Sequence, residues 1–273
     1  MPTIRTAATH FNRLLLTGAA GALGCVLRPR LQRVCTVLRV SDMADLGGAA
    51  AGEELVPARL EDKAAMLSLL SAVDAVVHLG AVSTEHSFEE VLPANIVGTY
   101  NLYEAARRQG VRRIVFASSN HVTGFYRQDE VIGPRSPMRP DGYYGLSKAF
   151  GENLAQFYWD RYAIETVSLR IGSAYPEPKD RRMLATWLSY DDLERLVLAG
   201  LSAPVVGHSV VYGMSDNSAT WWDNTSARHI GFRPQGSSEA YRAAVEARQP
   251  TLDADDPATR LQGGVFVRAG PFN

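Results

Sequence analysis

The sequence is poor in cysteine, has no long apolar run and carries almost no net charge. Its 273 residues include only two cysteines, Cys25 and Cys35, too few for the disulfide framework that holds small secreted domains together. No stretch approaches the 18 or more apolar residues of a transmembrane helix, and residues 1–12 lack the apolar core of a secretory signal. We therefore expect a cytoplasmic protein without a membrane partner, in which both cysteines are small buried thiols.

An excess of either charge is also missing. Lys and Arg number 28 against 29 Asp and Glu, so the chain has neither the basic footprint of a nucleic-acid-binding protein nor a polybasic membrane patch. Metal-ligand spacings are absent too, because neither His208 nor His229 has a partner at a suitable distance in the sequence. We expect no metal, no nucleic acid and a small-molecule partner that is recognised locally.

A glycine-rich turn is the first positive signal. The run Leu14-Leu15-Leu16-Thr17 predicts a buried strand, after which three glycines at a spacing of three open a helix. Such a turn lets a pyrophosphate approach the backbone, and the free N–H groups of the helix face the anion. The spacing G-x-x-G-x-x-G differs from the G-x-G-x-x-G fingerprint, so a chance turn of small residues is the alternative. The phosphate cradle would comprise Gly18, Gly21, Ala22, Leu23 and Gly24.

A second strand, predicted over residues 34–42, ends in the carboxylate of Asp42, 18 residues beyond Gly24. Near this spacing an acidic residue accepts hydrogen bonds from the adenosine ribose. The same carboxylate would repel a 2′-phosphate, and no Lys or Arg lies within the glycine turn. These features predict NAD as the cofactor. Arg39 shares a strand face with Val37 and Ser41 and is interpreted as structural rather than as a phosphate clamp.

Strands and helices alternate through the middle of the chain. Apolar runs predict strands over 55–57, 75–79, 113–118 and 166–171, and helical patterns predict helices over 62–70, 88–109 and 145–162. This βαβ rhythm predicts an α/β fold, a doubly wound Rossmann-type parallel sheet with helices on both faces. Ligands of such sheets bind beyond the carboxyl ends of the strands.

The expected organisation is a loose tail over 1–12, an NAD-binding core over 13–172, and a small C-terminal portion over 173–273 that binds substrate and completes the core. Along the ligand-binding rim we expect Gly18, Asp42, Gly80, Ser83 and Ser119.

Tyr144 and Lys148 are four residues apart at the start of a predicted helix, so they share a face. An ammonium beside a phenol favours the phenolate and lowers the pKa of the tyrosine, which could then take a proton from a substrate hydroxyl. The alternative is an ordinary amphipathic helix with a surface lysine. Its apolar stripe would consist of Phe150, Leu154, Phe157 and Tyr158.

These motifs together resemble the extended short-chain dehydrogenase/reductase family. The resemblance includes the glycine turn, residues 77–81 and 95–99, the Ser118-Ser119 strand end and Tyr144-x-x-x-Lys148. Within that family the chain is most similar to bacterial uronate dehydrogenases. This closer resemblance extends from about Arg13 to Phe266 and is carried by residues 114–121, 170–173, 182–187, 221–224 and 262–267.

The resemblance implies roles for individual residues. The position of Tyr144 is that of the general base, Lys148 that of the residue that lowers its pKa and holds the nicotinamide ribose, and Ser119 that of the residue that steadies the reacting hydroxyl. The positions that contact the sugar acid in uronate dehydrogenases match Ser83, Ser119, Asn120, His121, Ser173 and Arg182. An arginine fork suits a carboxylate, and asparagine and histidine can bind sugar hydroxyls.

One departure from the family pattern concerns the adenine end of the cofactor. Arg59 stands where family members commonly carry an acidic residue for the adenine amino group. The backbone of Leu60 is then the expected adenine contact, and Leu79 is expected to join it in the cofactor site.

The implied activity is NAD-dependent oxidation of the anomeric hydroxyl of a hexuronic acid, glucuronate or galacturonate, to the aldarolactone. Little chain follows Lys148, which favours a free monosaccharide acid over a nucleotide-sugar. The alternatives are a sugar epimerase or dehydratase of the same fold and a non-catalytic NAD-sensing protein. A homo-oligomer is compatible with the sequence.

Some residues have a structural interpretation beside the functional one. Asp191 and Asp192 follow Ser189 in what reads as the first turn of a helix, where the dipole stabilises acids. The Trp221-Trp222 pair is interpreted as packing, and a satisfied loop histidine is the alternative for His121.

Overall fold

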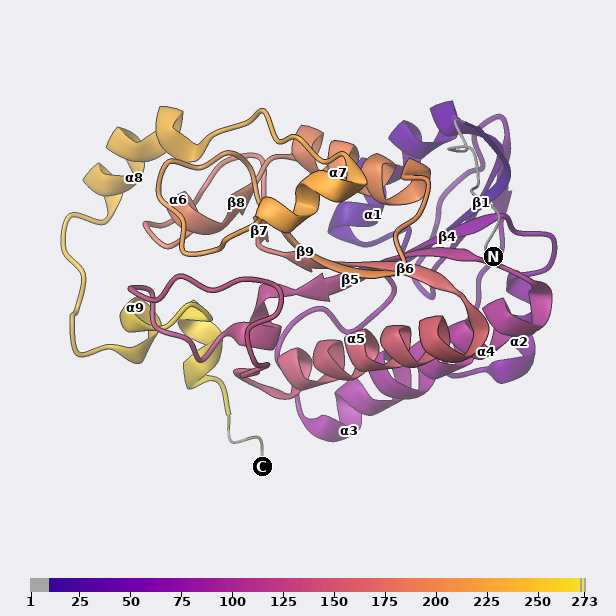
Figure 1. The fold of residues 1–273 in the computed structure, drawn as a ribbon, viewed down its shortest axis with the longest axis horizontal. Helices are drawn as coiled ribbons and strands as arrows, with labels where there is room; N and C mark the ends of the chain where they lie inside the picture. The colour runs from indigo at the N-terminus through magenta and orange to yellow at the C-terminus, as the bar shows by residue number, and fades with distance from the viewer. Residues whose placement is uncertain (1–9, 271, 273) are drawn as a thin grey trace.

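The computed structural model describes residues 10–270 and 272, and its centre is a seven-stranded parallel sheet (Figure 1). The strand order is β3-β2-β1-β4-β5-β6-β9, and every neighbouring pair is parallel. The predicted doubly wound α/β fold is therefore confirmed. The strands are β1 (Phe11–Thr17), β2 (Cys35–Ser41), β3 (Glu53–Leu55), β4 (Ala75–His78), β5 (Arg113–Ser119), β6 (Glu165–Ile171) and β9 (His208–Gly213).

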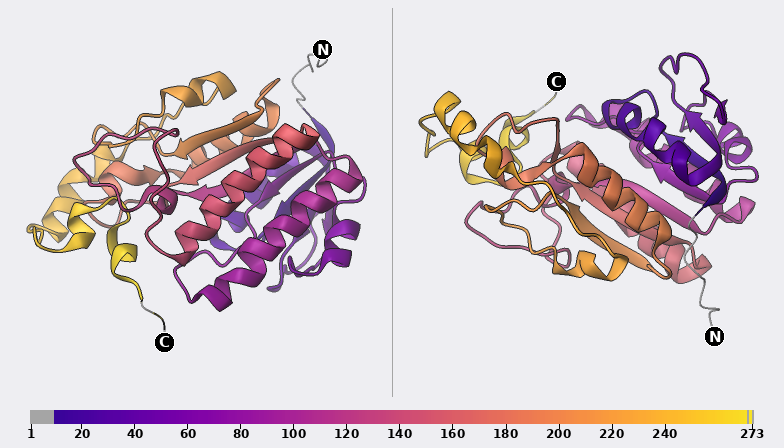
Figure 2. Two further views of the ribbon diagram at one scale, coloured as in Figure 1. Left: turned by 60° about the horizontal axis from the view of Figure 1, so that its bottom comes forward. Right: turned by 90° about the horizontal axis from the view of Figure 1, so that it is seen from above.

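Helices cover both faces of this sheet. The helices are α1 (Ala22–Leu31), α2 (Lys63–Leu69), α3 (Phe88–Val91), α4 (Thr99–Gln109), α5 (Tyr143–Tyr162), α6 (Met183–Thr186), α7 (Tyr190–Ser202), α8 (Arg242–Arg248) and α9 (Pro257–Arg260). One apolar core joins the sheet to α1 and α7, and a second joins it to α2, α4 and α5. Helices α4 and α5 run side by side across the second face (Figures 1 and 2).

The residues after β6 serve two purposes. Helix α7 and strand β9 complete the central sheet and its cover, whereas the remaining segments form a small lobe beyond the carboxyl ends of the strands (Figure 1). This lobe contains the short parallel pair β7 (Ser173–Ala174) and β8 (Trp187–Leu188). A third apolar cluster, in which Trp222 stacks on Tyr212 with ring centroids 4.7 Å apart, holds it to the sheet. The interpretation of the Trp221-Trp222 pair as packing is confirmed.

Several predicted boundaries need correction. The sheet already begins at Phe11, so the last two residues of the predicted tail belong to β1, and residues 1–9 lie outside the described residues. The third strand is Glu53–Leu55 rather than 55–57, a short edge strand whose pattern is weak. The helix predicted over 88–109 is interrupted by the π-helical segment η2 (Leu92–Gly98), where Pro93 lacks the N–H of a regular turn. Gly110 ends it with φ +76°, as expected.

The apolar stripe predicted for α5 is confirmed only in part. Tyr158 is buried and Leu154 packs against the core, but Phe157 is 46% exposed, and most of the buried face consists of small and polar residues. A Cβ at Gly151 would lie 2.4 Å from Cζ of Phe116, so α5 packs on the sheet at a distance that only small residues allow. Cys35 is buried as predicted, but Cys25 is exposed on α1.

Candidate active site

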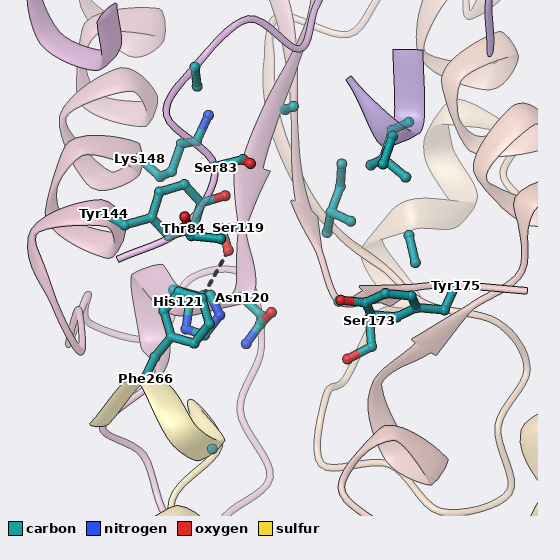
Figure 3. Close-up of a pocket in the computed structure, with 18 of the residues that line it drawn as sticks. Ser83, Thr84, Ser119, Asn120, His121, Tyr144, Lys148, Ser173, Tyr175 and Phe266 are labelled. Carbon is teal, nitrogen blue, oxygen red and sulfur yellow. Dashed lines mark hydrogen bonds between the residues drawn. The ribbon is translucent and has the colours of Figure 1, made fainter. Parts of the chain in front are cut away.

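All sixteen predicted site residues line one cavity of about 1460 Å³, which extends from the glycine turn to the C-terminal lobe. The cavity lies over the carboxyl ends of β1, β4, β5 and β6, where the strand order reverses between β1 and β4. Figure 3 shows part of this cavity, with Tyr144, Lys148 and Ser119 on one wall and Ser173 on the other. The residues that the sequence analysis predicted for one site therefore do lie around one cavity in the fold.

The glycine turn connects β1 to α1 and has the shape of an anion cradle. Gly18 adopts φ +70°, and a Cβ there would lie 2.7 Å from the backbone N of Gly80, so the loops after β1 and β4 touch. A Cβ at Gly24 would lie 2.1 Å from the Gly18 carbonyl oxygen. Helix α1 begins after Gly21 without a side-chain cap, which leaves its first N–H groups, beginning with Ala22 and Leu23, free for a phosphate. These contacts fit a dinucleotide.

Asp42 follows β2 at the side of this turn. One of its carboxylate oxygens accepts a hydrogen bond from the Ala20 N–H at 3.0 Å, which holds the carboxylate beside the cradle. Arg39 points elsewhere, to Glu54 at 2.8 Å and to the Leu69 carbonyl at 2.7 Å, so its structural interpretation is confirmed.

The part of the cavity where the adenine contact was expected contains an acid that the sequence interpretation missed. The side chain of Arg59 is exposed and pairs with Glu61 at 2.6 Å, and Glu61 also lines the cavity. The Leu60 carbonyl accepts a hydrogen bond from Asn101 at 3.1 Å, and Leu79 hydrogen-bonds through its N–H to the Thr17 carbonyl at 3.2 Å. The backbone at this end is thus fixed before any cofactor binds.

Tyr144 and Lys148 project from the first turns of α5 toward Ser119 at the end of β5 (Figure 3). Burial raises the pKa of the Tyr144 phenol to about 12, although the Ser119 hydroxyl acts in the opposite direction. Burial lowers the pKa of Lys148 to about 7. The expected lowering of the tyrosine pKa by the lysine is therefore not present in the ligand-free chain, because desolvation dominates both groups.

The loop that carries Ser83 is held from two sides. The Asn95 side chain, within the π-helical segment, accepts from the Val82 N–H at 2.8 Å and donates to the Val82 carbonyl at 2.9 Å. Glu85, which sequence reasoning missed, accepts from the backbone N–H groups of Tyr143 and Tyr144 at 2.7 and 2.9 Å. Glu85 thus joins the Ser83 loop to the free N-terminus of the helix that carries Tyr144.

Arg182 lies on the opposite wall, near Asp180 and Asp141 but in hydrogen-bond contact with neither. Its guanidinium donates to the Gln262 carbonyl at 2.7 Å and to the Ser173 hydroxyl at 3.4 Å. With the Asn120 amide turned to satisfy both of its ends, the amide oxygen accepts from Arg182 at 2.9 Å. None of the ion pairs within residues 10–270 includes Arg182, and burial lowers the pKa of its guanidinium. A half-buried guanidinium whose hydrogen bonds go only to neutral acceptors suits an anionic ligand.

The neighbouring Arg181 is oriented differently. It donates to the backbone carbonyls of Gln249 at 2.7 Å and Pro250 at 3.3 Å, so it holds the segment after α8. Gly264, with φ +63°, allows the approach of Arg182, since a Cβ there would lie 2.6 Å from Cδ of that side chain. Both arginines line the cavity, but of the two it is Arg182 that contacts the predicted site residues Ser173 and Asn120.

His121 lies between these walls. Its Nδ1 is 2.7 Å from a carboxylate oxygen of Asp141, and its ring stacks on Phe266 with centroids 3.9 Å apart. Sequence reasoning missed Asp141, because it is a single acid in a loop. The Gly263-Gly264 pair was a weak signal of a close approach at this point, since a Cβ at Gly263 would collide with the Asp141 carboxylate.

The structural interpretations of other polar residues are confirmed. Asp192 is fully buried and accepts from Ser215 at 2.6 Å, while Ser189 caps α7. His208 and His229 hydrogen-bond to Ser168 and Ser209. No group of three or more potential metal ligands occurs among the residues that the structure describes. Within the same residues, no helix is both long and apolar enough to cross a bilayer.

Comparison with known proteins agrees with this geometry. The model of the NAD dependent epimerase/dehydratase family matches residues 14–198. The chain is 60% identical to uronate dehydrogenase of Pseudomonas putida over 97% of this chain and 99% of that protein. It is similar to the crystal structure of glucuronic acid dehydrogenase from Chromohalobacter salexigens, with 50% identity, a TM-score of 0.93 and coverage of 95% and 97%. A tyrosine-to-alanine mutant of uronate dehydrogenase from Agrobacterium tumefaciens, complexed with NAD, gives 48% identity, a TM-score of 0.94 and coverage of 96% and 99%.

Proposed function

The chain belongs to the NAD dependent epimerase/dehydratase family, and from this premise we propose that it oxidises the anomeric hydroxyl of a hexuronic acid with NAD, giving the aldarolactone and NADH. Full-length relatives at 49% to 60% identity are uronate dehydrogenases. The cradle at Gly18 and Gly24, which side chains would fill, fits the cofactor. NAD, when bound, supplies the hydride acceptor.

Each residue around the reacting carbon has a separate role in the proposed reaction. Tyr144 takes the proton of the anomeric hydroxyl, and Ser119 holds the same oxygen while the hydride leaves the carbon that bears it. A phenol with a pKa near 12 is almost fully protonated at neutral pH, so little phenolate is available as a base. Lys148 lowers that pKa only as an ammonium, and the ribose hydroxyls of a bound NAD would supply the solvation that burial removes from it. Asn120, Ser173 and His121 bind the sugar hydroxyls.

The observation that carries the choice of substrate is Arg182. A guanidinium with only neutral acceptors at 2.7 to 3.4 Å is incomplete until an anion arrives. A hexuronic acid brings a carboxylate that such a fork can bind in bidentate geometry. The small lobe that follows β6 also favours a free sugar acid over a nucleotide-sugar.

Production of NADH tests this proposal. When glucuronate or galacturonate is added to the purified protein with NAD, NADH should form and its absorbance should rise. Addition of glucose should form little NADH. An epimerase of the same fold would return the hydride and accumulate no NADH, and an NAD sensor would bind NAD without turnover. The intact set of Ser119, Tyr144 and Lys148 supports the dehydrogenase over the sensor, because a sensor needs no base. A cytoplasmic location and a homo-oligomeric state stay predictions.

A further inference from the structure

Asp141 and His121 form a pair at the edge of the substrate space. The Nδ1 atom of His121 lies 2.7 Å from Oδ2 of Asp141, and the Asp141 side chain has no exposed surface. Asp141 is the second residue before α5, whereas His121 follows β5 in η3 (Asn120–Thr123). The pair therefore connects the helix that carries Tyr144 with the strand end that carries Ser119.

The fold makes room for this carboxylate at three places where a side chain would collide with it. A Cβ at Gly124 would lie 1.8 Å from its Oδ2, a Cβ at Gly263 1.9 Å from the same atom, and a Cβ at Gly145 3.1 Å from its Oδ1. Within the described residues Oδ1 has no hydrogen-bond partner, so half of the carboxylate is buried without compensation. Burial of this kind is costly and gives little stability in return. His121 is the one side chain to which the carboxylate is hydrogen-bonded among those residues.

The contact with Asp141 favours one tautomer of His121. A carboxylate only accepts hydrogen bonds, so in the neutral imidazole Nδ1 carries the proton and Nε2 keeps its lone pair. Phe266 stacks on the ring and Tyr144 meets its edge with centroids 5.8 Å apart, so the hydrogen bond to Asp141 adds the contact that selects which ring nitrogen faces the cavity (Figure 3). Nε2 has no partner in the part of the chain that the structure describes, and His121 lines the cavity. The substrate thus meets an acceptor at this position.

We propose that Asp141 is a positioning residue, which fixes His121 as the acceptor of one ring hydroxyl of the sugar acid. The inference deepens the proposed function and depends on it. An acceptor at Nε2 cannot bind the carboxylate, which Arg182 takes, so the two walls bind different parts of one substrate. The pair makes the chain selective for the hydroxyl pattern of the acid, and Arg182 makes it selective for the acid itself.

The first test uses the 2-, 3- and 4-deoxy analogues of glucuronate, which together cover the ring hydroxyls other than the reacting one. In the wild-type enzyme kcat/KM should fall about 3- to 10-fold for the analogue that lacks the hydroxyl bound by His121. In Asp141→Ala that analogue and glucuronate should differ by less than about twofold, because the imidazole then loses the hydrogen bond that fixes both its orientation and its tautomer. Asp192→Asn, a change at a buried acid outside the cavity, should keep the wild-type pattern. The same pattern of deoxy losses in Asp141→Ala as in the wild type would overturn the proposal.

The second test needs no variant. Nitrogen NMR of the histidine rings in the wild-type holoenzyme should show His121 with a protonated Nδ1 and an unprotonated Nε2. A protonated Nε2 would overturn the proposal even if Asp141→Ala does not fold. If no uronate yields NADH, the proposed function fails, whereas the NMR result is independent of turnover.

Discussion

Replacing Lys148 with Met should stabilise the cofactor-free protein, and the gain should depend on pH. Lys148 is 4% exposed, and its Nζ lies 5.2 Å from the centre of the Phe116 ring. No ion pair among residues 10–270 includes it. Burial lowers its pKa from 10.5 to about 7, so the folded chain binds this proton less well than the unfolded chain does.

The sign and the size of the expected stability change follow from this difference in pKa between the folded and the unfolded chain. Between pH 7 and 10.5 the unfolded chain binds more protons, so the stability of the wild type rises with pH in this interval. The cost of burying the ammonium is complete below pH 7 and disappears above 10.5. At 1.36 kcal/mol per pKa unit the full cost is about 5 kcal/mol, an upper figure. Lys148→Met should therefore gain up to about 5 kcal/mol at pH 6 but only about 2 kcal/mol at pH 9.

Urea unfolding of both proteins without NAD, at pH 6 and pH 9, measures this gain as a difference in the free energy of unfolding. Lys63→Met is a matched control, because Lys63 is an exposed residue at the start of α2 and should change stability by less than about 0.5 kcal/mol. An equal gain in the free energy of unfolding at both pH values would refute the reasoning, because the gain would then not depend on the charge of Lys148. No gain would also refute it, because the lysine would then be solvated in the free protein.

Three further predictions concern the cofactor and the base. Tyr144→Phe should lower kcat by about 10²- to 10⁴-fold with NAD affinity nearly unchanged, and retention of more than about a tenth of the activity would remove Tyr144 from the role of base. Asp42→Ala should weaken NAD binding and reduce the discrimination against NADP in steady-state kinetics; equal use of both cofactors by the wild type would contradict this. Gly24→Ala should weaken NAD binding at least about 10-fold in calorimetry, because its Cβ would lie 2.1 Å from the Gly18 carbonyl oxygen. Gly48→Ala, which has open space around its Cβ, is the control and should bind NAD like the wild type. Equal NAD affinities of Gly24→Ala and the wild type would exclude the proposed cradle.

The parts of the fold that the sequence predicts are those with a repeating or local signal. Apolar runs such as residues 14–17 and 113–118 are fully buried strands, and Gly18 and Gly110 occupy positions with positive φ. The spacing of Tyr144 and Lys148 on one helix is likewise local. These features need no knowledge of distant contacts.

The parts that the sequence does not predict depend on contacts between distant segments. Asp141 is one acid in an irregular loop. Its proposed role depends on His121, Gly124 and Gly263, which are distant in the sequence and lie around it only in the fold. Glu85 reaches the start of α5 across the sheet rim. The stripe expected on α5 was wrong at Phe157 for a related reason, because much of this helix packs on the sheet through small residues and leaves that side chain exposed.

The central claim is that Arg182 binds the carboxylate of the substrate during NAD-dependent oxidation. The most direct measurement is kcat/KM for glucuronate and for glucose in the wild type, Arg182→Ala and Arg181→Ala. A charged hydrogen-bonded pair contributes about 1.5–3 kcal/mol, so Arg182→Ala should reduce kcat/KM for glucuronate by about 10- to 150-fold and that for glucose hardly at all. Arg181→Ala, which removes contacts to the Gln249 and Pro250 carbonyls, should affect both sugars alike. Equal losses for glucuronate and glucose in Arg182→Ala would contradict the account.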